Sequence, residues 1–194
     1  MFGWKVLQKS ELPNANSILV VEEFKDLQDF ENLLQKSLED YKNSNSPNVS
    51  IKECILKIAK QEKILLAKDK FEKLCEMAGK HLQGFGPFEY FLNDENVEEI
   101  CVTGINKPLS VYFKGKGWME CNLTFTSQES AINFINKMAR EVGRHISLQS
   151  PRINAVLPNG QRLHATIPPI SKDVEITIRR FQKQPINALD LLKN

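Results

Sequence analysis

The sequence predicts an α+β protein in which an N-terminal helical segment precedes a mainly antiparallel sheet with covering helices. Three observations support this class. Before residue 84, apolar residues recur at helical spacing among charged ones. From Gly84 onward, turn residues and β-branched residues become more frequent, and alternation replaces the helical period. The patterns there run strand, strand, helix, strand, strand, strand, and 194 residues are enough for both parts.

The first element is an amphipathic helix over residues 22–42. Its apolar positions form one narrow stripe that begins at Phe24 and ends at Tyr41. A polar run at 43–48, which includes a proline, ends the helix. The stripe would suit an oligomeric contact, but we expect it to pack against the rest of the same chain.

A second helical pattern follows this polar run. Ser50 and Glu53 have the spacing of a capping box, and apolar residues continue the helical period from Ile51 toward Lys80. The glycine at 84 ends the pattern, so we place a domain boundary near Gln83. Residues 1–83 are then the helical segment.

The sheet begins with a strand entry at 97–102. Residues 109–113 alternate between apolar and polar up to a Lys-Gly-Lys-Gly turn at 114–117. Trp118–Phe125 is the expected return strand of this hairpin.

A helix is predicted to cover one face of the sheet. Thr126 and Glu129 have capping-box spacing, and apolar residues continue at helical intervals until Gly143. Three short strands follow, and a Pro-Asn-Gly turn at 158–160 joins the first two. These strands are expected at 153–157, 163–167 and 174–178.

Bulk properties exclude several classes of function. A formal charge of +2 is too small to favour non-specific DNA or RNA binding, so we expect no nucleic-acid partner. No signal peptide and no stretch of about 18 apolar residues is present, which favours a cytoplasmic protein. The cysteines have neither metal-ligand nor disulfide-framework spacing, so we expect reduced thiols. They are Cys54, Cys75, Cys101 and Cys121.

Strand parity places several basic residues on one face of the sheet. Because side chains alternate, Arg162 and Arg179 should share the face opposite the core, and Arg152 should join them from the neighbouring strand. Guanidinium groups offer planar donor forks that suit phosphate oxygens, so the cluster would form an anion site. The competing interpretation is that these arginines only solvate an exposed face.

Other chemistry finds little support in the sequence. His164 lies near no carboxylate or nucleophile at a recognisable spacing, and His81 and His145 are best explained as cations at helix C-termini. A phosphate-binding Gly-x-x-x-x-Gly-Lys-[Ser/Thr] loop, paired catalytic carboxylates, a nucleophile motif and a zinc signature are all missing. The chain is therefore not expected to hydrolyse a nucleotide alone.

Several motifs, in this order, resemble the N-terminal domain of type II and type IV secretion-system ATPases, a family that includes pilus and archaellum motors. The resemblance covers roughly residues 84–194. The helices before residue 84 are similar only in kind to the variable helical extension of archaeal members. The motifs are Gly-Phe-Gly-Pro-Phe-Glu at 84–89, Asn-Val-Glu-Glu-Ile at 96–100, Gly-Arg at 143–144, Pro-Asn-Gly-Gln-Arg at 158–162, Pro-Pro at 168–169 and Ile-Thr-Ile-Arg-Arg-Phe at 176–181.

The resemblance implies a PAS-like domain over 84–181 and a linker at 182–194 that leads, through a short helix, into a RecA-like motor domain. Such motors form homo-hexameric rings at the cytoplasmic face of a membrane and work with a membrane platform protein. The sequence ends at Asn194, where the motor would begin. We expect either the N-terminal part of a longer ATPase or a short protein that kept only the regulatory and assembly half.

The family also implies site residues. Its N-terminal domain presents arginines to the phosphates of ATP, whose Mg²⁺ is held by the motor domain. These arginines match Arg162 and Arg179. Arg152, Arg144 and Arg180 are weaker candidates, and Arg180 has inward parity unless the strand ends before it. Two alternatives stay open: a stand-alone adaptor that docks on a secretion machine through its helices, and a small-molecule sensor with an apolar pocket.

Overall fold

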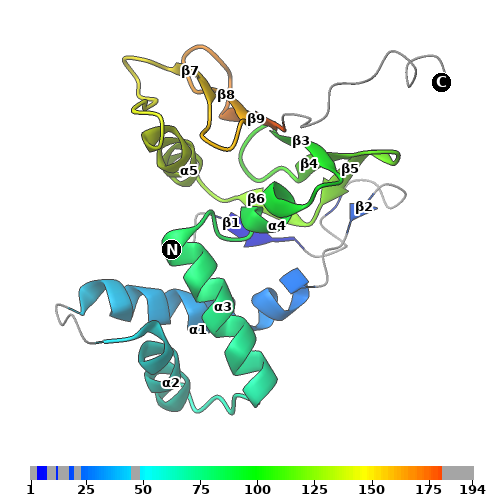
Figure 1. Cartoon of the computed structure of the whole chain (residues 1–194). Coiled ribbons are helices and arrows are strands. Elements are labelled where there is room, and N and C mark those ends of the chain that lie inside the picture. The colour runs from blue at the N-terminus through cyan, green and yellow to red at the C-terminus, as the bar shows by residue number, and fades with distance from the viewer. Residues whose placement is uncertain (1–3, 8–11, 13–17, 20–22, 45–48, 181–194) are drawn as a thin grey trace.

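The computed structural model describes residues 4–7, 12, 18–19, 23–44 and 49–180. Three helices gather at one end of the molecule, and the strands with two further helices lie at the other (Figure 1). This arrangement confirms the predicted α+β class. The linker expected at 182–194 lies outside the described residues.

The helical end consists of α1 (Glu23–Asn43), α2 (Ile51–Gln61) and α3 (Lys68–Gln83). Leu33, Leu34 and Leu38 of α1 are buried, so its apolar stripe packs within the chain as expected. The capping box before α2 is also confirmed, because the Ser50 hydroxyl accepts from the Glu53 amide and the Glu53 carboxylate accepts from the Ser50 amide.

The second helical pattern was predicted as one helix, but the chain breaks it into α2 and α3. After α2 the amide of Lys63 bonds to the carbonyl of Lys60, and the amide of Ile64 bonds to the carbonyl of Ala59. Lys63 has a φ of 57°, so these bonds form a Schellman C-cap with a lysine in the left-handed position. The apolar period continues through the turn, which is why periodicity alone did not locate it.

Among the described residues, the main sheet has seven strands in the order β2-β5-β4-β3-β9-β8-β7, and its pairings are antiparallel except that of β2 with β5. The three C-terminal strands lie within one residue of their predicted bounds. The strands are β2 Ile18–Leu19, β3 Val97–Val102, β4 Leu109–Phe113, β5 Gly117–Cys121, β7 Arg152–Val156, β8 Arg162–Thr166 and β9 Glu175–Arg179.

The expected return strand Trp118–Phe125 is two strands. It is interrupted at Asn122, a buried polar residue, and β6 (Leu123–Phe125) leaves the main sheet to pair with β1 (Trp4–Val6). Neither β1 nor β2 was predicted, because each is short and is defined by a partner about a hundred residues away. The short helix α4 (Phe88–Asn93) was also missed.

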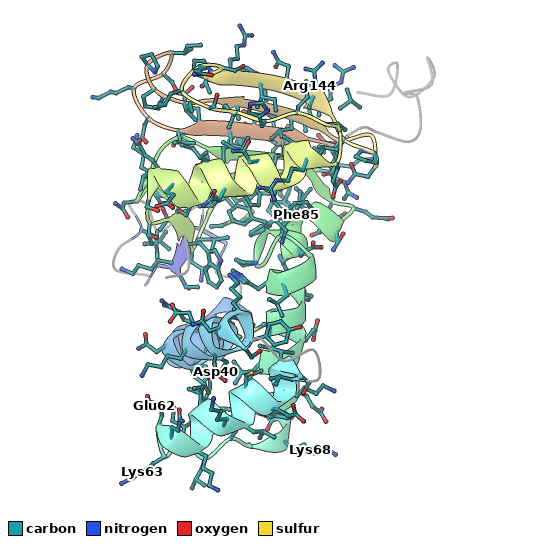
Figure 2. The ribbon with its side chains drawn as sticks, turned by 90° about the vertical axis from the view of Figure 1, so that its left-hand side faces the viewer. Asp40, Glu62, Lys63, Lys68, Phe85 and Arg144 are labelled. Atoms are coloured by element: carbon teal, nitrogen blue, oxygen red, sulfur yellow. The ribbon has the colours of Figure 1, made fainter. Side chains whose placement is uncertain are left out.

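The predicted covering helix is α5 (Gln128–Arg140), and Figure 2 shows it running alongside the strands β7–β9. Its N-cap is Ser127, whose hydroxyl accepts from the amide of Ser130, and not Thr126 as the capping-box spacing suggested. A serine one residue closer to the helix provides the same acceptor, so the sequence did not distinguish the two.

One hydrophobic core connects both ends of the molecule. It includes Leu34 and Ala78 of the helices together with Ile176 and Ile178 of the sheet. The ring centroid of Phe88 on α4 lies 5.0 Å from that of Phe125 on β6 and 4.4 Å from that of Phe134 on α5. α3 ends at the predicted boundary near Gln83, but division into separate domains stays a prediction.

The four cysteines are free thiols, two buried and two half-buried, in agreement with the prediction. Burial is the main cause that raises the pKa of the Cys121 thiol to about 12, so this thiol stays protonated. Within the described ranges, no helix is long and apolar enough to cross a membrane.

Candidate functional site: an arginine groove on the sheet

Cross-strand register brings the two leading candidates together. Arg162 on β8 and Arg179 on β9 are direct partners, and Glu99 on β3 is the partner of Arg179 on its other side. The residues next to the arginines, Leu163 and Ile178, are buried in the core. The predicted strand parity is therefore confirmed, and both arginine side chains are exposed on the opposite face.

A second row of polar residues lies two positions further along the same strands. His164 on β8 pairs with Thr177 on β9 and with Asn154 on β7. The Nδ1 atom of His164 lies 2.5 Å from Oδ1 of Asn154, which fixes the half-buried imidazole ring against the edge strand. In the tautomer with its proton on Nδ1, the ring donates to this oxygen and its Nε2 atom is an acceptor.

Arg144 reaches this face from the end of α5. Gly143 has a φ of 67°, and the Arg144 amide bonds to the carbonyl of Ala139 at 3.0 Å, so the chain turns sharply after the helix. One guanidinium nitrogen of Arg144 then donates to the backbone carbonyl of Asn154 at 2.6 Å. Figure 2 shows Arg144 at the level of the upper strands and above α5.

These side chains border an open cavity of about 770 Å³, which we call the arginine groove. Its basic groups are Arg144, Arg162 and Arg179. Within the described part of the chain, Arg162 and Arg179 form no ion pair or hydrogen bond through their side chains. The remaining lining residues are Glu99, Val142, Asn154, Ala155, Val156, Leu163, His164 and Thr177.

The structure separates the other two candidates from the groove. Arg152 is exposed on the same sheet, but it pairs with Thr166, four residues along β8 from Arg162. Arg180 follows the last residue of β9, and its guanidinium donates to the carbonyl of Asp94. That contact holds the end of β9 against the loop between α4 and β3, so Arg180 has a structural role.

Sequence reasoning missed Glu99 and Cys101. The Cys101 thiol lies 3.6 Å from a Glu99 carboxylate oxygen and 3.7 Å from the Thr177 hydroxyl. Glu99 borders the groove and Cys101 reaches Thr177 only because β3 pairs with β9, far away in the sequence. No local pattern signals that pairing, whereas the β7–β8 hairpin was readable from its turn.

The interpretation of His81 as a helix C-terminal cation is wrong. Burial is the main cause that lowers its pKa to about 4, and repulsion from Lys42 and Lys137 adds to it, so the imidazole is neutral near pH 7. Lys80 is a cation in the last turn of α3, and the ammonium group of Lys137 on α5 donates to the carbonyls of His81 and Gly84. His145 is exposed, as expected for a residue in the turn after α5.

The groove has the chemistry of an anion site. It offers three guanidinium groups, an imidazole and a hydroxyl, against one carboxylate. Planar guanidinium forks donate in pairs to phosphate or carboxylate oxygens. Among the described residues, no group of three or more His, Cys, Asp or Glu side chains is placed to hold a metal ion.

Comparison with known proteins adds a second line of evidence. No family model matches the chain. An uncharacterised protein of Methanocaldococcus jannaschii is 28% identical over 152 residues, which are 78% of this chain and 56% of that protein. The type IV secretion system protein VirB11 of Bartonella henselae is 31% identical over 108 residues, covering 54% of this chain and 30% of that protein. The chain is similar to VirB11.

The VirB11 similarity supports, at a coarse level, the resemblance to secretion ATPases. The VirB11 ATPase from the Brucella suis type IV secretion system, whose crystal structure is in complex with sulphate, is 24% identical in sequence to this chain. The structural alignment covers 55% of this chain and 33% of the VirB11 chain, at a TM-score of 0.46. The chain spans about half the length of the M. jannaschii relative and less than a third of VirB11.

Proposed function

We propose that this chain is the N-terminal assembly and nucleotide-clamping part of a hexameric secretion or pilus-assembly ATPase. The observation that supports the clamp best is the direct register of Arg162 and Arg179 across β8 and β9. Glu99, the cross-strand partner of Arg179, is the one carboxylate among the groove residues, so the two exposed guanidinium groups leave the groove with an excess of positive charge that an anion would balance. The triphosphate of ATP is the anion that a secretion ATPase would supply.

The clamp works through charge and position. Arg162 and Arg179 project from paired positions on adjacent strands, so the sheet fixes the spacing of their Cα atoms and both can contact one phosphate chain. ATP with Mg²⁺, held by a RecA-like motor domain, would supply the phosphoryl group for hydrolysis. The arginines neutralise charge on its terminal phosphates and so stabilise the closed arrangement of the two domains.

Arg144 is the third member of the clamp in this proposal. Its hydrogen bond to the Asn154 carbonyl uses one guanidinium nitrogen and leaves the other donors for a ligand. The groove residue Asn154 also contacts His164, so a single edge-strand residue holds two groove side chains in place. The groove therefore matches an extended polyanion better than a single small ion.

The proposed assembly follows from the same resemblance to secretion ATPases. Closure of each clamp over its nucleotide would couple hydrolysis to domain rotation around a homo-hexameric ring. The ring would lie in the cytoplasm, peripheral to the inner face of the membrane, and engage a membrane platform protein. A stand-alone adaptor that docks on another protein's motor is the main alternative.

The deciding experiment is to read the coding DNA beyond the codon for Asn194. An in-frame Gly-x-x-x-x-Gly-Lys-[Ser/Thr] within about 100 codons, the length of a further domain, would support the ATPase. A stop codon directly after Asn194 would exclude a motor domain in the same chain and leave the adaptor.

If the motor domain is present, charge reversal tests the clamp in the full-length enzyme. We expect Arg162→Glu and Arg179→Glu each to reduce kcat for ATP hydrolysis by roughly a hundredfold, the usual cost of losing a charge-stabilising group. Arg140→Glu is the matched control, because Arg140 is an exposed arginine outside the groove. Equal activity of Arg162→Glu and the control variant would overturn the clamp.

A further inference from the structure

We propose that the turn between α2 and α3 binds the surface of an anionic lipid membrane. We call this turn, with the flanking helix ends, the basic tip. It lies at the end of the helical part furthest from the strands (Figure 2). The basic tip consists of Leu56, Lys60, Lys63, Ile64, Leu65 and Lys68.

Three large apolar side chains are exposed together at this tip. Leu65 is 98% exposed, Leu56 is 53% exposed and Ile64 is 36% exposed. Leu56 and Lys60 lie one turn apart on α2, and Ile64 and Leu65 follow shortly after the C-cap of that helix. The next residue, Leu66, packs against the core. The chain thus buries one leucine of the pair and presents the other to solvent.

The turn that presents Leu65 is tightly held. The Schellman bonds of Lys63 and Ile64 close it, and the carboxylate of Glu62 lies 2.5 Å from the ammonium group of Lys36 on α1. A lysine occupies a left-handed position that glycine would fill without strain. The tip therefore keeps a charged side chain where folding alone would favour glycine.

The start of α3 also departs from what helix stability favours. Ala67 at the N-cap provides no side-chain hydrogen bond, and Lys68 stands in the first turn, where the helix dipole disfavours a cation. These departures coincide with the exposed leucine. Together they indicate that the tip serves binding.

Positive charge is concentrated at the same place. Residues 56–68 contain four lysines and one glutamate, a larger excess than the +2 of the whole chain. Lys57 is neutralised by Asp40 at 2.6 Å. Within the described residues, Lys60, Lys63 and Lys68 form no ion pair. Figure 2 shows Lys63 and Lys68 directed away from the helices.

A lipid surface fits this tip better than a folded protein does. A stable protein interface needs roughly 800 Å² on each partner, and the tip is a single protruding turn. A bilayer yields to a protruding leucine, while lysines extend their ammonium groups to the headgroups. Each lysine near an anionic surface strengthens binding about fivefold, so three lysines and a leucine suffice for weak, reversible binding.

This proposal depends on the proposed function in one respect: a secretion ATPase would bring the chain to a membrane. A secretion ring peripheral to a membrane would present this end of each subunit to lipid. The residues involved are separate from the arginine groove, so Arg162→Glu is expected to leave vesicle binding unchanged. Failure of the clamp and failure of the tip are therefore measured independently.

The test is co-sedimentation of the full chain with vesicles. We expect binding to vesicles of phosphatidylcholine mixed with phosphatidylserine, little binding to phosphatidylcholine alone, and loss of binding at high salt. Leu65→Ser should weaken binding roughly tenfold and Lys63→Gly about fivefold. The matched controls are Leu148→Ser and Lys116→Gln, which alter exposed residues outside the tip.

Two results would overturn the proposal. One is binding to the mixed vesicles that Leu65→Ser and Lys63→Gly reduce no more than the two controls do. The other is absence of binding to the mixed vesicles at low salt. Poly-glutamate binding that depends on Lys63 and Lys68 would then assign the tip to an acidic protein partner.

Discussion

His81 is a half-buried imidazole at the junction of α3 with the sheet, and its pKa is lowered to about 4, chiefly by burial. The unfolded chain binds this proton near its ordinary pKa of 6.5. Stability from the neutral ring is therefore fully present above about pH 6.5 and is lost as the pH falls toward 4. The loss amounts to at most about 3 kcal/mol.

The corresponding prediction concerns His81→Asn, which removes the titrating group and keeps a similar polar side chain. We expect the variant to lose less stability than the wild type between pH 7 and about pH 4.5, as measured by urea denaturation at each pH. Titrating carboxylates change the stability of both proteins in the same way. Only the difference between the two slopes of unfolding free energy against pH is therefore informative. Identical slopes would mean that His81 is not the group that resists protonation.

Lys63 gives a second residue-scale prediction. Because its φ of 57° is strained for a residue with a Cβ, Lys63→Gly should raise the free energy of unfolding by about 1 kcal/mol. Thermal or chemical denaturation measures the change. Lys60→Gly is the opposite control, since glycine inside α2 should destabilise by about 1 kcal/mol. A destabilised Lys63→Gly would show that the lysine side chain contributes contacts that outweigh the strain.

At the scale of elements, register decides which arginines act together. Val156 on β7 is the partner of Arg162, and Arg152 lies four residues earlier on β7. At a rise of about 3.3 Å per residue, Arg152 is roughly 13 Å from the row that contains Arg162 and Arg179. One polyphosphate contacting the groove therefore leaves Arg152 to solvent.

We predict a clear contrast between variants in binding of inorganic tripolyphosphate at low salt, measured by isothermal titration calorimetry. Arg179→Glu should weaken binding at least tenfold, because it removes charge-assisted hydrogen bonds and adds repulsion. Arg152→Glu should weaken it by less than about threefold through longer-range repulsion alone. Similar losses in both variants would place the anion outside the groove.

At the scale of the whole molecule, Lys137 links the helical end to the sheet. Its ammonium group on α5 donates to backbone carbonyls at the end of α3 and lies 5.8 Å from the Phe85 ring centroid. Burial is the main cause that lowers its pKa. This side chain therefore provides polar contacts between α5 and the end of α3.

Lys137→Met should keep the packing of the aliphatic stem and lose these contacts. We expect the free energy of unfolding to fall by about 1–3 kcal/mol, because the carbonyls of His81 and Gly84 lose a charged donor. Urea denaturation followed by near-UV and far-UV signals measures the change. Coincident transitions would indicate one cooperative unit, in line with the single core, whereas separated transitions would support the predicted boundary near Gln83.

The sequence by itself determined the elements whose signals are local. The helix over α1, the Ser50 cap, the β7–β8 hairpin and the parity of Arg162 and Arg179 depend on periodicity, capping and turn chemistry between near neighbours. For the same reason, the sequence predicted the α+β class and the leading pair of candidate arginines.

Only the tertiary structure decided the features that depend on distant partners. The pairing of β1 with β6, the entry of Glu99 into the groove, the separation of Arg152 from it and the neutral state of His81 are examples. Each is set by strand pairing or burial between residues far apart in the chain, which no local pattern encodes. Register turned a list of five candidate arginines into one groove, because in a sheet a shift of a few residues moves a side chain by a whole ligand length.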